Sequence, residues 1–173
     1  MQNRFETHCH FEWSNIRFLD AINKLEPTIN YAIEIGLKGL CITDHGCICG
    51  WMKANILQKE LKEKGIDFKI GLGEEGYLVD KRENGIKYYH CIWLAKDAIG
   101  AKQIRKISSL AWMNSYYDRG IERVCITKEE LTNIVKENPG HIIVTTACIS
   151  GEVSSSILAM ETARKIQDVK TAE

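Results

Sequence analysis

The sequence lacks three features: a long apolar run, a basic-then-apolar stretch in its first residues, and an excess of charge of either sign. A transmembrane helix needs about 20 predominantly apolar residues in a row, and no segment provides them. The first residues also lack the pattern of a secretory signal. Lysine plus arginine and aspartate plus glutamate both total 23, which argues against wholesale electrostatic capture of nucleic acid or membrane. We therefore expect a cytoplasmic protein with no membrane partner.

Linkers, internal repeats and low-complexity tracts are missing as well, so the 173 residues suit one compact domain or part of a larger one. Gly71-Leu72-Gly73 precedes a strand pattern rather than a helix, which makes it a poor phosphate-binding loop. The seven cysteines are odd in number and lack a secretion signal, which favours reduced thiols. Cys47-Ile48-Cys49 is too tightly spaced for a zinc knuckle and has no second pair.

Strand-like and helix-like patterns alternate along the chain. This rhythm predicts an α/β fold with a mostly parallel sheet and outer helices, either a barrel or a doubly wound sheet. Two of the strand patterns are short, nearly continuous apolar runs, which is typical of strands buried on both faces. The expected strands are Arg4–Phe11, Leu37–Thr43 (apolar), Phe68–Val79, Ile86–Ala95 after an Asn84-Gly85 hairpin turn, and His141–Thr146 (apolar). The expected helices run from Pro27 to Gly36, from Trp51 to Lys64, from Asp97 to about Tyr117, from a capping box at Thr127–Glu130 to Lys136, and from Glu152 to about Lys165.

His8-Cys9-His10 lies near the end of the first expected strand. Alternate residues of a strand project to the same face, so the imidazoles of His8 and His10 converge on one point. Converging imidazoles indicate a metal site more than a core position. Asp44-His45 follows the second strand, and the carboxyl ends of strands share one face in α/β barrels, where catalytic groups gather. The other polar candidates close to strand ends are Glu74, Glu75, His90 and Cys148.

Imidazole, carboxylate and thiolate together suit zinc best, and manganese or iron are also compatible. Such a site can lower the pKa of a bound water and hold a phosphate between metals, which is the logic of phosphoester hydrolysis. Three of the candidates also have structural interpretations when taken singly. His90 would be a satisfied core or surface histidine, Glu75 a solvated strand position, and Cys148 a small buried residue. We interpret His141 as structural because it begins its strand, away from the site.

Six segments occur in an order and spacing far more specific than a single His-x-His: THCHFEWSNIRFLD, LKGLCITDHG, IGLGEEGYLV, YYHCIWLAKD, ISSLAW and IIVTTACISGEV. With these segments, which cover about residues 4–153, the chain resembles the PHP (polymerase and histidinol phosphatase) domain of bacterial DNA polymerase III alpha subunits. The resemblance implies a distorted (βα)7 barrel around up to three divalent metal ions, usually zinc, manganese or iron. It also implies phosphoester hydrolysis, including 3′–5′ exonuclease action on DNA in some members, whereas in others the domain is a scaffold for the polymerase.

The resemblance assigns roles to the residues of the first two motifs. His8 and His10 match the first motif as ligands, and Asp20 resembles the acidic ligand that follows it, with looser spacing here. Asp44 and His45 match the second motif and would be the catalytic residues, with His45 also a ligand. Asp44 would orient the ligands or accept a proton.

The later motifs complete the ligand set that the resemblance implies. Glu75, rather than Glu74, precedes the Gly-Tyr-Leu-Val of the family's glutamate-containing strand. His90 matches the histidine of the next strand, and Cys148 matches a position where some polymerase versions carry a cysteine ligand. The implied metal ligands are therefore His8, His10, Asp20, His45, Glu75, His90 and Cys148.

The family's final Asp-x-His motif does not follow Cys148 within these 173 residues. We therefore expect residues 1–173 to be the N-terminal portion of the PHP domain of a DNA polymerase III alpha-type replicative polymerase, with an incomplete barrel. The expected partners are DNA, through the parent polymerase, and the remainder of the polymerase or a partner chain that completes the barrel. Two alternatives remain: a catalytically silent scaffold fragment and a free-standing small-molecule phosphoesterase. ISSLAW and TACISGEV favour a polymerase relative over the latter.

Overall fold

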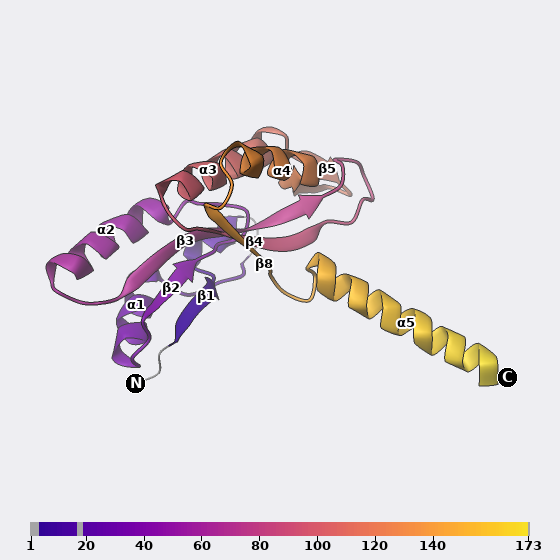
Figure 1. Ribbon diagram of the computed structural model, residues 1–173, viewed down its shortest axis with the longest axis horizontal. Helices are drawn as coiled ribbons and strands as arrows, with labels where there is room; N and C mark the ends of the chain where they lie inside the picture. The colour runs from indigo at the N-terminus through magenta and orange to yellow at the C-terminus, as the bar shows by residue number, and fades with distance from the viewer. Residues whose placement is uncertain (1–3, 17–18, 173) are drawn as a thin grey trace.

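A curled, mixed β-sheet covered by helices forms the body of the molecule (Figure 1), and the computed structural model describes residues 4–16 and 19–172. Helices α1 to α4 lie against the sheet, whereas α5 extends away from it. The strands are β1 (Phe5–Cys9), β2 (Gly39–Ile42), β3 (Lys69–Val79), β4 (Tyr89–Ala95), β5 (Tyr116–Asp118), β6 (Ile121–Arg123), β7 (Cys125–Thr127) and β8 (Ile142–Thr146). The helices are η1 (Glu12–Ile16, a 3₁₀ helix), α1 (Leu25–Glu34), α2 (Trp51–Glu63), α3 (Ala98–Met113), α4 (Lys128–Glu137) and α5 (Glu152–Ala172).

The main sheet runs in the order β1-β2-β3-β4-β8, and β7 pairs with the far end of the long strand β3. The β1–β2, β2–β3 and β3–β7 pairs are parallel, whereas β3–β4 and β4–β8 are antiparallel. β5 and β6 form a separate antiparallel hairpin. The predicted α/β class is therefore confirmed, but a mostly parallel sheet is not, because both neighbours of β4 run against it. The seven βα units of a complete barrel stay a prediction.

The two faces of the sheet carry different cores. Leu40, Ile42 and Trp93 face the helices and belong to one large buried cluster with residues of α1, α2, α3 and α4. Cys41 and Ile92 alternate with them and face the inner, concave side, where a much smaller apolar cluster lies. Because side chains alternate along a strand, each strand contributes both to a packed outer layer and to the inner surface that carries polar groups.

The helix boundaries follow local chemistry. Pro27 lies in the first turn of α1, and Gly36, with φ of +83°, follows the end of that helix. The capping box at the start of α4 is confirmed, since the Thr127 hydroxyl accepts from the Glu130 amide and the Glu130 carboxylate accepts from the Thr127 amide. In the described part of the chain, no helix combines the length and apolar character needed to cross a bilayer.

Three expected elements are corrected by the structure. The helix expected to reach Tyr117 ends at Met113, and the two tyrosines that follow lie in strand β5. The return strand expected from Ile86 begins only at Tyr89, because the β3–β4 loop is longer than the Asn84-Gly85 turn. Strand β8 was expected to be buried on both faces but is largely exposed, since α5 extends away rather than folding back over it.

Candidate metal centre

Four adjacent strands bring the predicted histidines and carboxylates together at one edge of the sheet. β1 carries one histidine and ends just before the next, and residues 44–46 extend β2 along β3. The Glu75 amide donates to the Asp44 carbonyl, and the Gly46 amide donates to the Glu75 carbonyl. On β3, Glu75 opposes Ile92 and faces the inner surface, whereas Glu74 opposes Trp93 and is buried under the helices. Three overlapping groups result, each with ligand atoms within 4.8 Å: His8, His10 and Glu75; His10, Asp20 and His45; and His45, Glu75 and His90.

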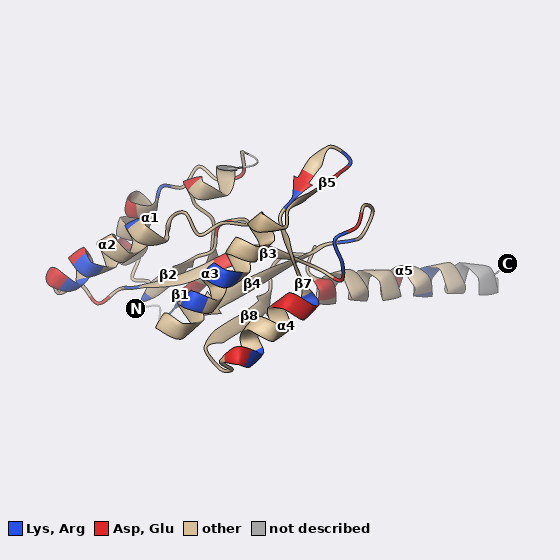
Figure 2. Ribbon diagram, turned by 90° about the horizontal axis from the view of Figure 1, so that it is seen from above, with Lys and Arg blue, Asp and Glu red and all other residues tan. Residues whose placement is uncertain are grey.

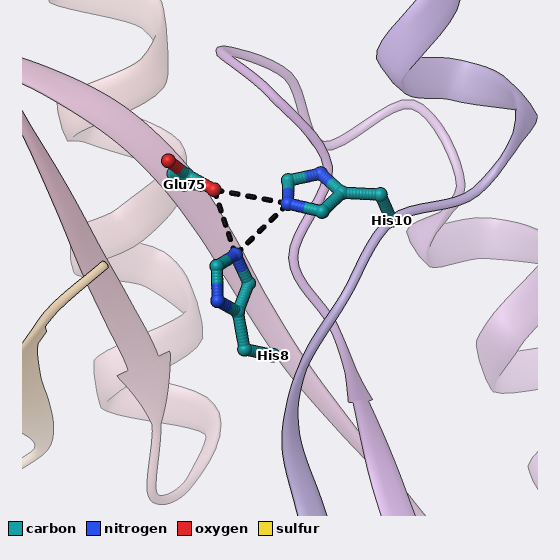
Figure 3. A group of neighbouring side chains, drawn as sticks. All are labelled: His8, His10 and Glu75. Carbon is teal, nitrogen blue, oxygen red and sulfur yellow. Dashed lines mark hydrogen bonds and ion pairs between the residues drawn. The ribbon is translucent and has the colours of Figure 1, made fainter. Parts of the chain in front are cut away.

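His8, His10 and Glu75 form the tightest group (Figure 3). The Nε2 atoms of the two imidazoles lie 2.8 Å apart, and Oε2 of Glu75 lies 2.7 Å from His8 Nε2 and 3.0 Å from His10 Nε2. All three side chains point toward one another from β1, from the residue just after it, and from β3. An ion with bonds of about 2 Å can touch three atoms at this spacing, so the donor set fits a divalent metal.

The other two groups extend the centre on either side of His45. Oδ2 of Asp20 lies 2.9 Å from His45 Nε2, and His45 Nδ1 lies 3.7 Å from Glu75 Oε2. Nδ1 of His90 lies 2.6 Å from Glu75 Oε1. Both oxygens of Glu75 are thus shared among histidines from different strands. The arrangement places one buried carboxylate at the middle of a cluster of imidazoles.

The electrostatics of the centre follow from this single buried carboxylate. Burial acts to raise the pKa of Glu75, but hydrogen bonds with His10, His8 and His90 outweigh it and hold that pKa well below its usual range. The hydrogen bond with Glu75 also raises the pKa of His8. His45 is affected in the opposite direction, since burial lowers its pKa. Glu75 therefore stays charged, and His45 favours the neutral form that binds metals.

Asp44 lies behind the histidines rather than among them. It is 1% exposed, and its Oδ1 accepts hydrogen bonds from the Phe11 amide at 2.7 Å, the Ser14 amide at 3.1 Å and the Ser14 hydroxyl at 2.7 Å. Burial raises the pKa of Asp44. The Ser14 oxygen, having donated its proton to Asp44, accepts from the His45 amide and lies 3.1 Å from His10 Nδ1. Nδ1 of His10 must then carry the proton, which leaves the Nε2 lone pair for a metal.

Sequence reasoning missed residues that support the centre, Ser14 and Asn15 among them. Ser14 lies on η1 and links Asp44 to both His10 and His45. Asn15 accepts through Oδ1 from the Asp20 amide and so holds the turn that presents Asp20. Neither has a sequence signal of its own, because a serine and an asparagine after an H-x-H motif read as ordinary turn residues.

Cys148 does not join the three groups. It is exposed, and its Sγ accepts from the Ser150 amide at 3.4 Å. The loop that carries it still touches the centre's framework, because the His90 amide donates to the Ser150 carbonyl. Its role as a ligand stays a prediction. His141 lies elsewhere and pairs through Nδ1 with Asp97 Oδ2 at 2.6 Å.

Comparison with known proteins gives a family and larger relatives. The profile of the PHP domain family matches residues 6–172. A protein named "Probable DNA polymerase YorL" of Bacillus subtilis is 40% identical over 165 residues, which are 89% of this chain and 13% of the relative. The DNA polymerase III subunit alpha of Borreliella burgdorferi is 32% identical over 159 residues, 88% of this chain and 12% of the relative. The chain thus spans about an eighth of the length of these curated relatives.

One solved structure also shows a likeness. It comes from Bifidobacterium adolescentis, and its assignment as a metal-dependent phosphoesterase is itself provisional. The match has a TM-score of 0.41 at 20% identity and covers 65% of this chain and 36% of that protein.

Proposed function

The chain belongs to the PHP domain family, and from this premise we propose that its metal centre hydrolyses phosphoester bonds with the help of bound divalent ions. The observation that carries the proposal is the convergence of four histidines and two carboxylates, in three overlapping groups, at one edge of the sheet. Imidazole and carboxylate donors around one bridging position are the chemistry that binuclear and trinuclear hydrolytic sites use.

We further propose that the chain is the PHP portion of a DNA polymerase III alpha-type replicative polymerase. Its support is the 40% and 32% identity to two proteins named as DNA polymerases, of which it matches only a small part. DNA would then be the substrate, with 3′–5′ exonuclease action as the reaction, and the cytoplasm the place of action. The remainder of the polymerase or a partner chain would cover the exposed β8.

Seven side chains are proposed to hold up to three ions, with zinc as the first choice and manganese or iron as alternatives. Bound ions would supply a water of lowered pKa and neutralise the phosphate. Glu75 would contribute to two of the three groups, because its Oε2 faces His8 and its Oε1 faces His90. Cys148 would join only after its loop turns inward. The proposed ligands are His8, His10, Asp20, His45, Glu75, His90 and Cys148.

Asp44 and His45 have separate proposed roles. His45 lies between the second and third groups and is proposed to touch the reacting atoms as well as a metal. Asp44 is fully buried behind Ser14, so we propose that it positions His10 rather than accepting a proton from substrate. The hydroxyl of Tyr77 lies 3.3 Å from His45 Nδ1 and would orient that ring.

The test combines metal content with activity. We expect the purified chain to bind zinc or manganese at one or more equivalents, and to hydrolyse a phosphodiester such as a labelled oligonucleotide in a metal-dependent way. His8→Ala and His10→Ala should remove both properties. His141→Ala is the matched control, since this histidine pairs with Asp97 away from the centre, and it should retain both. If the metal content of the wild type is at background, and His8→Ala and His10→Ala change neither metal content nor activity, the catalytically silent scaffold is favoured instead.

A further inference from the structure

A groove of about 530 Å³ lies beside the metal centre, and the hydrolysis proposed above does not account for it. Its walls come from the end of the β3–β4 loop, the β5–β6 hairpin, the loop after β8 and the first turns of α5. The volume falls within the range of small-molecule sites, about 300–1,000 Å³. We call it the hairpin groove, and the charged and aromatic residues that line it are Lys87, Tyr88, His90, Asp118, Arg119 and Arg123.

The hairpin groove has an excess of positive charge in a chain whose net charge is zero. Lys87, Arg119 and Arg123 line it, and Asp118 is the acidic residue among its lining. That carboxylate is divided between two arginines, with Oδ1 4.0 Å from Arg119 Nε and Oδ2 3.8 Å from Arg123 Nη2. Its Oδ1 also accepts from the Gly85 amide. One shared carboxylate cannot neutralise three cations, so the groove is suited to an anion.

A stack of planar groups leads from the hairpin groove to the metal centre. The guanidinium carbon of Arg123 lies 4.7 Å from the ring centre of Tyr88. The Tyr88 ring stacks on His90 with centroids 6.0 Å apart and planes 25° apart. His90 is itself 2.6 Å from Glu75. The groove and the metal centre therefore share one wall, and a ligand that extends past His90 reaches both.

We propose that the hairpin groove binds a single-stranded polynucleotide whose neighbouring phosphodiester lies at the metal centre, an inference that rests on the proposed function. Phosphates would contact Arg119, Arg123 and Lys87, and a base would continue the stack of Arg123 and Tyr88 by lying on the outer face of the Arg123 guanidinium. A positively charged groove combined with planar groups on which bases stack is how proteins hold single strands without reading their sequence. A small phosphomonoester has one phosphate, which the metal centre takes, and leaves the three cations without a ligand. Figure 2 shows the hairpin of β5 projecting from the body of the molecule with a basic position at its tip.

The experiment measures binding of the 173-residue chain to a fluorescein-labelled oligonucleotide of about 12 nucleotides by anisotropy, in EDTA, over a series of salt concentrations. Arg119→Asn is the first variant, because Arg119 is 81% exposed and has φ of 52°, which Asn tolerates. Loss of one phosphate contact on a single strand should reduce the slope of log affinity against log salt by about 0.7, and the affinity by about fourfold at 0.15 M salt.

Arg123→Lys separates charge from stacking. The variant keeps the positive charge but loses the planar guanidinium over Tyr88. The slope of log affinity against log salt should therefore equal that of the wild type, and the affinity should fall. Lys59→Ala is the control for loss of a cation, because Lys59 lies exposed on α2 and pairs only with Glu63 among the ion pairs of the described residues. It should match the wild type in affinity and in slope.

Two outcomes would overturn the inference. One is an Arg119→Asn variant whose salt slope and affinity equal those of the wild type. The other is complete displacement of the oligonucleotide by inorganic phosphate, at the phosphate concentration that saturates the metal-free chain. Failure of the proposed function looks different. If the oligonucleotide binds as expected but is not hydrolysed when zinc or manganese is added, the groove assignment stands and the hydrolase proposal falls. If a monoester is hydrolysed but the oligonucleotide does not bind, the hydrolase proposal stands and the groove assignment falls.

Discussion

At the scale of single residues, the candidate metal centre depends on the hydroxyl of Ser14, which lies behind the proposed ligands. Ser14 is 2% exposed and donates to Asp44, which forces it to accept from His10 Nδ1. A histidine ligand whose second nitrogen is held in this way has its tautomer and ring orientation set before the metal arrives. The same hydroxyl accepts from the backbone of His45, so two proposed ligands share one support.

Ser14→Ala should therefore weaken metal binding without removing a ligand. We expect the metal affinity to fall by about 10- to 100-fold, the usual cost of losing a partner behind a ligating histidine. Competition with a chromophoric chelator measures it directly. Ser108→Ala is the matched control, because Ser108 is 5% exposed and donates to Glu74 on the other face of the sheet. Equal metal affinities of the two variants would contradict the support role of Ser14.

Glu74 is a buried carboxyl whose pKa is shifted in the direction opposite to that of Glu75. It is buried under the helices, where Trp93 Nε1 donates to Oε2 and the Ser108 hydroxyl donates to Oε1, each at 3.0 Å. Burial outweighs these hydrogen bonds and raises the pKa of Glu74 to about 7. A carboxyl with a raised pKa holds its proton more tightly in the folded than in the unfolded state. Its contribution to stability is therefore lost as pH rises from about 4.5 to about 7.

Glu74→Gln should remove this pH dependence, because a neutral amide replaces the carboxyl. Relative to the wild type, the variant should gain about 2 to 3 kcal/mol of unfolding free energy between pH 5 and pH 8, from the shift of the pKa. The Ser108 hydroxyl can turn to accept from the new amide. Urea unfolding in EDTA at both pH values measures the difference. A gap between variant and wild type that is the same at pH 5 and pH 8 would contradict the raised pKa.

At the scale of elements, the sequence predicted best those features that are determined by residues close together in the chain. Turn and cap residues such as Gly36 and the capping box at Thr127 act through their own backbone, and the structure has the helix boundaries they indicate. Alternation along a strand predicted that His8 and His10 converge, and their Nε2 atoms lie 2.8 Å apart. These signals are readable because they involve neighbours in sequence.

Features that depend on distant partners could not be read in this way. The three-residue strands β5, β6 and β7 are too short for a pattern of their own, and β7 exists because it pairs with the end of β3. The direction of β8 relative to β4 could not be predicted either, because the apolar run of β8 is compatible with parallel or antiparallel pairing. Asp20 reaches His45 through a turn held by Asn15, a contact that spacing alone does not specify.

At the scale of the whole molecule, β8 and α5 leave apolar surface without a covering layer. β8 pairs with β4 along one edge, and within residues 4–16 and 19–172 no strand pairs with its other edge. Val144 on β8 is 49% exposed, and Ile157 on α5 is 54% exposed. Figures 1 and 2 both show α5 extending away from the sheet. An unpaired edge beside exposed apolar side chains is a template for association with another chain.

We therefore expect this chain in isolation to self-associate through β8 and α5, and charge placed on that surface to oppose it. The double variant Val144→Lys with Ile157→Lys should weaken association by about tenfold or more, because a lysine on an edge strand blocks pairing. Sedimentation velocity over a range of concentrations measures the shift. Met113→Lys is the control, since Met113 is 80% exposed at the end of α3, away from this surface. If the wild type stays monomeric at high concentration, or the control weakens association as much as the double variant, the association surface lies elsewhere.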